Sequence, residues 1–293
     1  MASHILQTNA EFTRMRDGTE SAVSERGQEA AAPNSHGGTG GRKGGREAAH
    51  RTVGRRLLHG VLPCLRTSLV SGTVVLVFVL GIPALLLAGA LFVMREVDPP
   101  GSSYIFSQRL AGVPVDQRWV PLDRISPHLI RAVISSEDNQ FCRHRGVDVR
   151  ELEAVLEQAE MSGDDVQRGG STITMQVAKN LFLWNSRTYL RKAIEIPLAY
   201  GIEAAWPKGR IMEVYLNIAE WGPGIFGAEA ASQHHFRKPA SRLTEREAAL
   251  LAVALPNPNT RVPSRPGPHM LKVAGVVERR ARVAGTRAAC AVR

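Results

Sequence analysis

Residues 135–148 read SSEDNQFCRHRGVD, and an apolar segment with the features of a helix precedes them. That helix is expected to begin at Ser126, whose side chain can cap free N–H groups, with Pro127 at the first helical position, where a missing N–H does no harm. Glu137 and Asp138 then place two negative charges at the far end, where the helix dipole disfavours them. Such a pair indicates either a solvated helix end or a site that uses an acid.

The spacing of this stretch predicts that the helix continues past its two acids. Glu137, Phe141 and His144 would then fall on one face, until Gly146 ends the element. On this stretch alone the structural and the functional interpretation are equally good.

A second polar stretch, residues 168–180, reads RGGSTITMQVAKN. Its glycines, Gly170 among them, let the backbone approach a ligand closely, and Ser171 or Thr172 begins a helix whose free N–H groups form an anion site. Three polar side chains share one face of that helix: Thr172, Gln176 and Lys179. Taken singly, each is explained as well by a capped helix with a solvated lysine.

A third stretch, residues 191–195, reads RKAIE. Arg191 and Glu195 are four residues apart, which on a helix predicts a surface ion pair worth about 0.3–0.5 kcal/mol. By itself this pattern carries no function.

Together the three stretches resemble the signature blocks of the peptidoglycan glycosyltransferases, specifically the monofunctional membrane-anchored transglycosylases that polymerise lipid II. Residues 208–217 and 227–231 resemble the fourth and fifth blocks, and the resemblance covers residues 119–263. The chain departs from the commonest pattern at Met175, where a glutamine is usual. The fold that the resemblance implies is mainly α, a lysozyme-like helical glycosyltransferase domain with a smaller membrane-proximal lobe, preceded by one transmembrane helix.

The resemblance also implies roles for individual residues. Glu137 matches the base that activates the acceptor's 4-hydroxyl, and burial beside Asp138 would raise its pKa in the same sense. Glu195 matches a glutamate near the leaving diphosphate, which makes it the second candidate catalytic residue beside Glu137. The candidate substrate-binding residues are Ser171, Thr172, Gln176, Lys179, Arg191, Lys192 and, ranked lowest, Lys208. The residues expected to support the site are Asp138, Phe141, His144, Gly170 and Asn217, with Asn217 and Glu213 holding the cleft by buried hydrogen bonds.

The implied reaction is transfer of a lipid-diphosphate-linked glycan onto lipid II, with inversion, to make β-1,4-linked strands for the cell wall. The family commonly uses a divalent cation, Mg or Mn, at the diphosphate, whereas the sequence contains no dedicated metal cage. The expected partners are lipid II, lipid-linked glycan, the membrane and other cell-wall synthesis or division proteins. Nucleic acid is not expected despite a net charge of +10, because reading motifs are absent and only 5% of residues are aromatic.

Residues 70–94 read VSGTVVLVFVLGIPALLLAGALFVM, without a charged side chain, and are long enough to cross a bilayer. The span is too long and too far from residue 1 for the apolar region of a cleaved signal peptide. Four arginines precede it: Arg51, Arg55, Arg56 and Arg66. The positive-inside rule then places the N-terminus in the cytoplasm and the catalytic domain in the periplasm, on a single-pass inner-membrane anchor.

The expected organisation has five parts. Residues 1–66 form a disordered basic cytoplasmic tail, 67–95 the signal anchor, 96–118 a linker, 119–265 the glycosyltransferase domain and 266–293 a basic C-terminal tail.

Further elements are expected from local patterns. Residues 104–106 and 113–115 read as short extended pieces, and 149–159 and 208–218 read as helices. A capping box at Thr244 is expected to open a last helix over 248–255.

Of the three cysteines, Cys64 lies on the cytoplasmic side by this topology. Only Cys142 and Cys290 could share an oxidising compartment, and their spacing gives no argument for a bridge.

Two other classes of function compete with the transferase. A lytic transglycosylase or muramidase also uses one dominant glutamate in a lysozyme-like domain, but it leaves Lys179, Arg191 and Lys192 without a role. A non-catalytic membrane scaffold in a cell-wall assembly would dock through the basic residues 272–293, which a solvated basic helix explains equally well.

Overall fold

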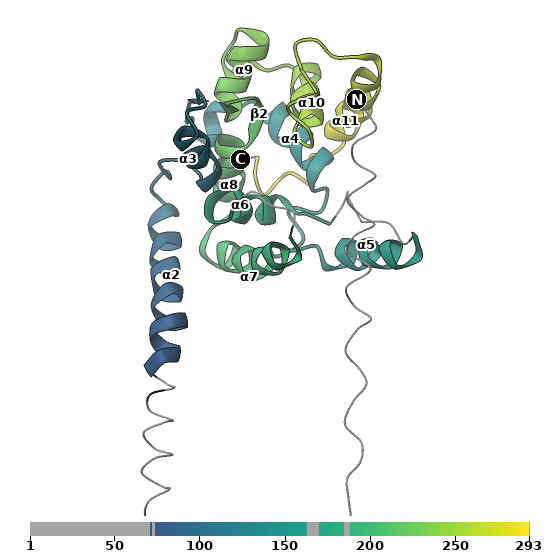
Figure 1. Cartoon of the computed structure of the whole chain (residues 1–293). Helices are drawn as coiled ribbons and strands as arrows, with labels where there is room; N and C mark the ends of the chain where they lie inside the picture. The colour runs from purple at the N-terminus through teal and green to yellow at the C-terminus, as the bar shows by residue number, and fades with distance from the viewer. Residues whose placement is uncertain (1–70, 72–73, 163–169, 185–187, 293) are drawn as a thin grey trace, which may run out of the picture. The chain divides into compact units, whose positions relative to one another are not determined.

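The computed structural model describes residues 71, 74–162, 170–184 and 188–292. The expected cytoplasmic tail, its arginines, Cys64 and the Arg168–Gly169 start of the second block lie outside the described residues. The described chain is mainly helical and carries one small sheet (Figure 1).

One helix in the described chain, Val74–Met94, is long and apolar enough to cross a membrane, with a mean hydropathy of 2.8 over 21 residues. A π-helical turn, η1 (Val77–Gly81), leads into α2 (Ile82–Met94), whose first turn contains Pro83. Because proline has no N–H to donate, the altered hydrogen-bond pattern immediately before it is expected. Side chains such as Leu85 and Phe92 stay more than 70% exposed, which suits contact with lipid rather than with a protein core. The predicted span is therefore helical over residues 74–94, and its length and composition fit a membrane anchor.

The expected linker contributes to the domain instead. Residues Ser103–Leu110 form helix α3, because the Ser102 side chain caps the N–H of Ile105. Ile105 is completely buried in the core. The prediction of an extended piece at 104–106 is therefore wrong, and so is a boundary that leaves this segment outside the domain.

The small sheet has the strand order β1–β3–β2. Strand β1 (Asp116–Gln117) pairs in parallel with β3 (Ile225–Phe226), and β2 (Glu220–Gly222) pairs with β3 antiparallel. Residues 113–115 lead into β1 without regular structure.

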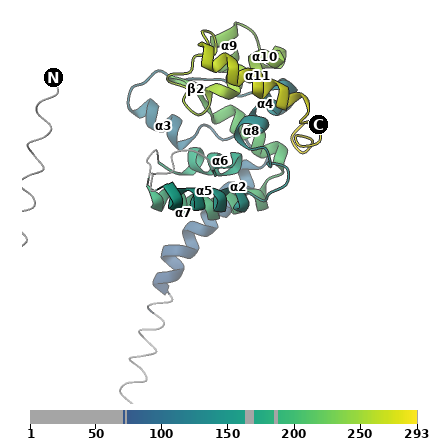
Figure 2. The same cartoon turned by 90° about the vertical axis from the view of Figure 1, so that its right-hand side faces the viewer.

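The helices form two layers above the anchor. The layer nearest α2 contains α5 (Val149–Ser162), α6 (Ile173–Phe182) and α7 (Tyr189–Ala205), as Figure 2 shows. The farther layer contains α4 (Pro127–Glu137), α8 (Lys208–Ile218), α9 (Ala228–Phe236), α10 (Glu245–Ala254) and α11 (Pro268–Arg282). Helix α6 packs on both α7 and α8 and so joins the layers. A smaller membrane-proximal lobe was the expectation, and the layer of α5 to α7 occupies that place.

Local start signals are confirmed where the sequence placed them. Ser126 caps α4 through the N–H of His128, with Pro127 in its first turn. Thr244 and Glu247 form the capping box of α10.

The C-terminal residues are part of the core rather than a tail. One face of α11 is buried against α4 and α10, through Met270, Ala274, Val277 and Ala281. The basic residues occupy the other face, where Arg282 pairs with Glu245 and Glu278. The separation of 266–293 as a basic tail is therefore wrong, since its apolar residues recur at helical spacing beneath the charge.

The end of the anchor is bonded to the domain. The indole N–H of Trp206 donates to the backbone oxygen of Leu91 at 2.7 Å. The guanidinium of Arg210 donates to the backbone oxygens of Met94 and Val97 and pairs with Asp98. The membrane helix thus meets the domain at a fixed junction beside α7 and α8.

A disulfide joins Cys142 to Cys290, whose Cα atoms lie 5.7 Å apart across a separation of 148 residues. The spacing of the cysteines gave no argument for this bridge, which depends on a tertiary contact.

Candidate active site

Glu137 is the last residue of α4, and the helix does not continue beyond it. Asp138 has an extended backbone (φ −158°, ψ 78°), and residues 139–146 form turns. The predicted helical face through Glu137, Phe141 and His144 is therefore wrong. The chain leaves the helix because Asp138 turns inward to bond groups from elsewhere in the site.

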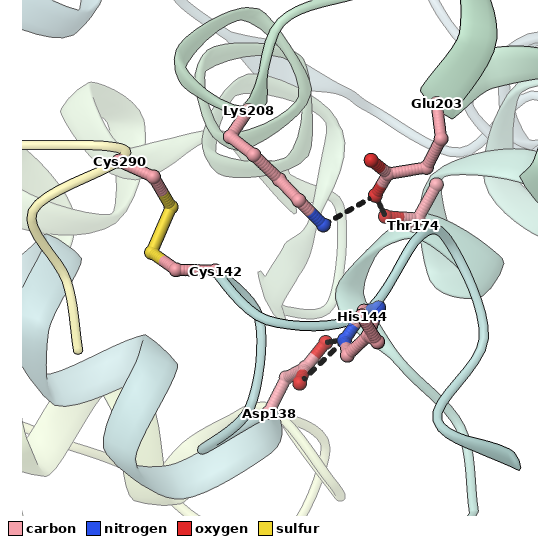
Figure 3. Close-up of a disulfide and its surroundings, with 7 residues drawn as sticks. All are labelled: Asp138, Cys142, His144, Thr174, Glu203, Lys208 and Cys290. Carbon is pink, nitrogen blue, oxygen red and sulfur yellow. Dashed lines mark hydrogen bonds and ion pairs between the residues drawn. A yellow bond between two sulfur atoms is a disulfide. The ribbon is translucent and has the colours of Figure 1, made fainter.

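Asp138 connects the first block to the second. Its carboxylate is buried and accepts a hydrogen bond at 2.9 Å from the backbone N–H of Ile173, in the first turn of α6. The Nε2 atom of His144 lies 2.9 Å from both of its oxygens (Figure 3). A carboxylate at a helix N-terminus is well placed electrostatically, so this bond fixes the end of α4 against the start of α6.

The carboxylate of Glu137 lies in a neutral hydrogen-bond chain. Its Oε2 accepts from the side-chain amide of Gln176 at 3.1 Å, and the amide oxygen of Gln176 accepts from the hydroxyl of Tyr215 at 3.2 Å. Burial raises the pKa of Glu137, and the charge of Asp138 adds to the rise. The bond from Gln176 and the charge of Arg261 oppose it without cancelling it. A carboxylate with a raised pKa is suited to general-base chemistry.

The start of α6 is held by its own polar residues. Thr172 caps the helix through the N–H of Met175, and its hydroxyl donates to the backbone oxygen of Gly146 at 2.5 Å. Gly146 itself has φ +94°, and a side chain there would collide with the backbone of Ala199 on α7. Thr172 is buried and fully engaged, so the structure gives it a structural role in place of the predicted substrate contact.

Three cations gather where α6 faces the start of α7. Burial lowers the pKa of Lys179, and the charge of Arg191 lowers it further, while Glu137 acts in the opposite sense. The pKa of Lys192 falls to about 8, through burial first and then the charges of Arg191 and Lys179. These mutual effects place Glu137 and the three cations in one electrostatic neighbourhood. A cluster of like charges that are partly desolvated is stabilised by an anion.

Glu195 supplies the counter-charge of this cluster. Its carboxylate is 4% exposed and contacts the guanidinium of Arg191, with the ammonium of Lys192 3.3 Å away. The prediction of a surface ion pair is wrong, because the pair is buried. Lys192 also donates to the hydroxyl of Ser171 at 2.5 Å, which connects the second and third blocks.

A cavity of about 350 Å³ opens beside Gln176 and Lys179. Its other wall carries Glu220, whose carboxylate accepts from the hydroxyl of Tyr104 at 3.3 Å. The remaining polar lining includes three neutral amides, Asn180, Asn257 and Asn259. The apolar lining includes Trp184, which is exposed. The cavity thus has the cation Lys179 at one end and the acid Glu220, among neutral groups, at the other.

A model of the Transglycosylase family matches residues 106–286, and this range contains every residue of the site described above except Tyr104. The chain belongs to the transglycosylase family. The transglycosylase domain is 56% identical over 175 residues to a biosynthetic peptidoglycan transglycosylase of Agrobacterium fabrum, an alignment that covers 60% of this chain and 76% of the relative. A protein of the same name from Rhodospirillum centenum is 52% identical over 198 residues, covering 67% of this chain and 85% of the relative.

Lys208 and Phe141 support the transglycosylase site from beneath. The ammonium of Lys208 lies 4.4 Å from the centre of the Phe141 ring and 2.6 Å from a carboxylate oxygen of Glu203. The same oxygen accepts from Thr174 on α6, as Figure 3 shows. Lys208 is therefore engaged in an internal ion pair, and the geometry does not support its predicted contact with substrate.

Asn217 holds the edge of the transglycosylase domain as expected. It is completely buried, accepts from the N–H of Val120 and donates to the backbone oxygens of Val120 and Glu213. The carboxylate of Glu213 accepts from the N–H of Leu122. The expected hydrogen bonds from this pair are present, and their role in holding the cleft stays a prediction.

Several residues around the transglycosylase site were not predicted from sequence as site residues: Tyr104, Tyr215, Glu220 and Arg261. Tyr215 lies within the predicted helix 208–218, and the hydroxyl of this otherwise apolar side chain is the sequence signal that points to a polar role. The others are close to Glu137 or the cavity only through the tertiary fold.

The residues present fit a metal ion poorly. Among the described residues, no group of three or more His, Cys, Asp or Glu could hold one. Glu195 already pairs with two cations, so its oxygens are not available as ligands. No step of the reaction is therefore assigned to a metal ion.

Proposed function

We propose that this chain is a membrane-anchored peptidoglycan glycosyltransferase that polymerises lipid II into β-1,4-linked glycan and releases undecaprenyl diphosphate. The observation that carries the proposal is the arrangement around α6. Glu137 is hydrogen-bonded to Gln176 of this helix, and Lys179, one turn further along, interacts electrostatically with Glu137, Arg191 and Lys192.

Glu137 is the general base. It takes the proton from the 4-hydroxyl of the acceptor sugar as that oxygen attacks the anomeric carbon of the donor. The hydrogen bond from the uncharged Gln176 amide orients the carboxylate and lowers its pKa less than a direct ion pair would. Tyr215 in turn fixes the orientation of the Gln176 amide.

The cations receive the leaving group. As the bond from the anomeric carbon to the diphosphate oxygen breaks, negative charge grows on the diphosphate, and preorganised cations stabilise it. Glu195 holds Arg191 and Lys192 in place through its two ion pairs, so we assign it a positioning role instead of the direct one that the sequence resemblance implied.

The end of the cavity around Glu220 suits the sugars of the growing strand. Amides, a phenol and an aromatic face are the groups that bind uncharged sugar hydroxyls and ring faces. Glu220 and Tyr104 provide a hydrogen-bonded pair on that wall.

The surface of α7 suits a membrane interface. The exposed positions among its described side chains are all apolar or aromatic, at helical spacing: Leu190, Ala193, Pro197, Tyr200 and Ala204. Since α2 contacts α7, this face lies next to the membrane anchor. The disulfide supports a location of the domain outside the cytoplasm, and hence the periplasmic orientation on an inner membrane.

Polymerisation of purified lipid II tests the proposal. Wild-type full-length protein in liposomes is expected to make glycan, and Glu137→Gln is expected to stay folded and membrane-bound but inactive. Glu153→Gln, which alters an exposed acid on α5, is the matched control and is expected to keep the wild-type rate. Glycan made by Glu137→Gln at the control rate would remove Glu137 from the base role. Digestion of finished glycan without synthesis would support a lytic enzyme instead.

A further inference from the structure

The loop between Glu137 and α5 carries one half of the disulfide. Cys142 lies in this loop, between Phe141, which is buried, and His144, which contacts Asp138 (Figure 3). We call residues 139–146 the catalytic loop, because its first residue follows the Glu137–Asp138 pair directly. A covalent bond at this position acts within a few residues of the proposed base.

The other half lies in a short segment after α11, residues 283–292, which we call the C-terminal strap. Three alanines of the strap are completely or almost completely buried: Ala284, Ala288 and Ala291. Backbone bonds from Ala288 to Ala284 and from Ala291 to Ala288 fold it into turns. The strap is thus an ordered part of the domain that extends from α11 to the catalytic loop.

A second contact joins the same two segments. The guanidinium of Arg287 in the strap lies 3.4 Å from the side-chain oxygen of Asn139, the residue after Asp138. The strap therefore contacts the loop both at its start and at Cys142. From the opposite side, the loop is bound by Asp138–His144 and by the Thr172 bond to Gly146.

We propose that the Cys142–Cys290 disulfide is a positioning element for catalysis, which holds the catalytic loop so that the end of α4 stays fixed against the start of α6. The proposal rests on the proposed function, because its effect is a change in transferase rate. Its further consequence is that full activity requires oxidation of the two thiols by a thiol–disulfide oxidant outside the cytoplasm, which accepts two electrons as two protons are released.

The physical reason is the sensitivity of catalysis to geometry. Asp138 bonds both His144 and the first turn of α6, so movement of the loop shifts Asp138 and its neighbour Glu137 relative to Gln176. Misplacement of a catalytic group by about 1 Å can cost about a hundredfold in rate. The cations that bind the diphosphate lie on α6 and α7, which the strap does not contact through these bonds, so substrate affinity is expected to change little.

The experiment compares oxidised and reduced full-length protein in liposomes, with lipid II as substrate. Dithiothreitol reduces the bridge by thiol–disulfide exchange and itself becomes a cyclic disulfide. We expect kcat to fall about tenfold with KM nearly unchanged. Reoxidation with oxidised glutathione is expected to restore kcat.

Cysteine variants separate the bridge from other effects of the reductant. The double variant Cys142→Ser, Cys290→Ser is expected to have the low kcat and no response to dithiothreitol. Cys64→Ser is the matched control and is expected to keep the wild-type rate and the full response. Arg287→Ala, which keeps the bridge but removes the contact with Asn139, is expected to lower kcat about twofold.

Hydrogen exchange distinguishes positioning from general stability. On reduction, exchange is expected to rise in residues 139–146 while α10 stays protected. Loss of protection in α10 together with the loop would assign the bridge to overall stability and overturn the proposal, as would an unchanged kcat in reduced protein. Failure of oxidised wild type to polymerise lipid II would instead overturn the proposed function itself.

Discussion

The site contains two glutamates, Glu137 at the end of α4 and Glu195 on α7, and they differ in the groups that contact their carboxylates. Glu137 accepts a bond from a neutral amide, and burial raises its pKa. Glu195 is more deeply buried but contacts Arg191 and Lys192, two cations that stabilise its charge. The comparison shows that two carboxylates in one site can have opposite electrostatic surroundings. A cation favours the charged carboxylate with a full charge, whereas the amide of Gln176 lowers the pKa of Glu137 by less than burial raises it.

The largest expected difference between the two residues is in the rate. Glu137→Gln removes the base and is expected to lower kcat for lipid II polymerisation about a thousandfold. Glu195→Gln leaves the base intact and only disorders two cations, so about a tenfold loss is expected. Steady-state rates of both purified variants check this. A larger loss at Glu195 than at Glu137 would reverse the two assignments.

Stability is expected to show the opposite order. Glu195→Gln leaves Arg191 and Lys192 without their buried counter-charge, which is expected to lower the free energy of unfolding by about 3 kcal/mol. Glu137→Gln replaces a desolvated carboxylate by a neutral group and is expected to leave stability unchanged or slightly higher. Because the folded state raises the pKa of Glu137, its favourable contribution is present at acid pH and is lost as pH rises through that pKa.

Denaturant unfolding at neutral pH measures both variants. At pH below the ordinary range of glutamate, where Glu137 is protonated, Glu137→Gln and wild type are expected to be equally stable. A Glu195→Gln variant as stable as wild type would show that the pair contributes nothing to folding.

The pH dependence of kcat/KM tests Glu137 and the cation Lys192 in one measurement. Activity is expected to rise as Glu137 loses its proton and to fall above about pH 8, where Lys192 loses its own. In Lys192→Arg the cation stays charged, so the alkaline limb is expected to move to higher pH while the acid limb stays. An alkaline limb that does not move would assign it to another group.

The smallest effect is expected at the end of the cavity around Glu220. Glu220→Gln keeps the size of the side chain and weakens its bond with Tyr104, so affinity for a long lipid-linked glycan is expected to fall about threefold. Affinity for lipid II is expected to stay unchanged. Competition between short and long donors in one assay separates these outcomes.

What the sequence predicts best is local. The start of α4 follows from the cap at Ser126 and from Pro127 at the first helical position, both of which can be read from adjacent residues. The three blocks, which the resemblance predicted to belong together, do contact one another in the fold. The end of α4 was not predicted correctly. Asp138 leaves the helix to bond Ile173 and His144, and no local sequence pattern indicates these long-range bonds.

The C-terminal residues show a second kind of error. Their basic residues led to the prediction of a tail, whereas the spacing of Met270, Ala274 and Val277 predicts a buried helical face. The disulfide could not be predicted from any local pattern, because 148 residues separate its cysteines and only the folded core brings them together. Fixing both the loop and the proposed base thus depends on contacts that are distant in sequence.

The bonds from Trp206 and Arg210 to the end of the anchor have a consequence for how the enzyme meets its substrates. Under the proposed function, these bonds would restrict the height and tilt of the cavity relative to the bilayer. Lipid-linked sugars diffuse in two dimensions, so such a restriction would bring their reactive carbons to the level of Glu137. The apolar helix would then set the distance between the domain and the membrane as well as attach the two.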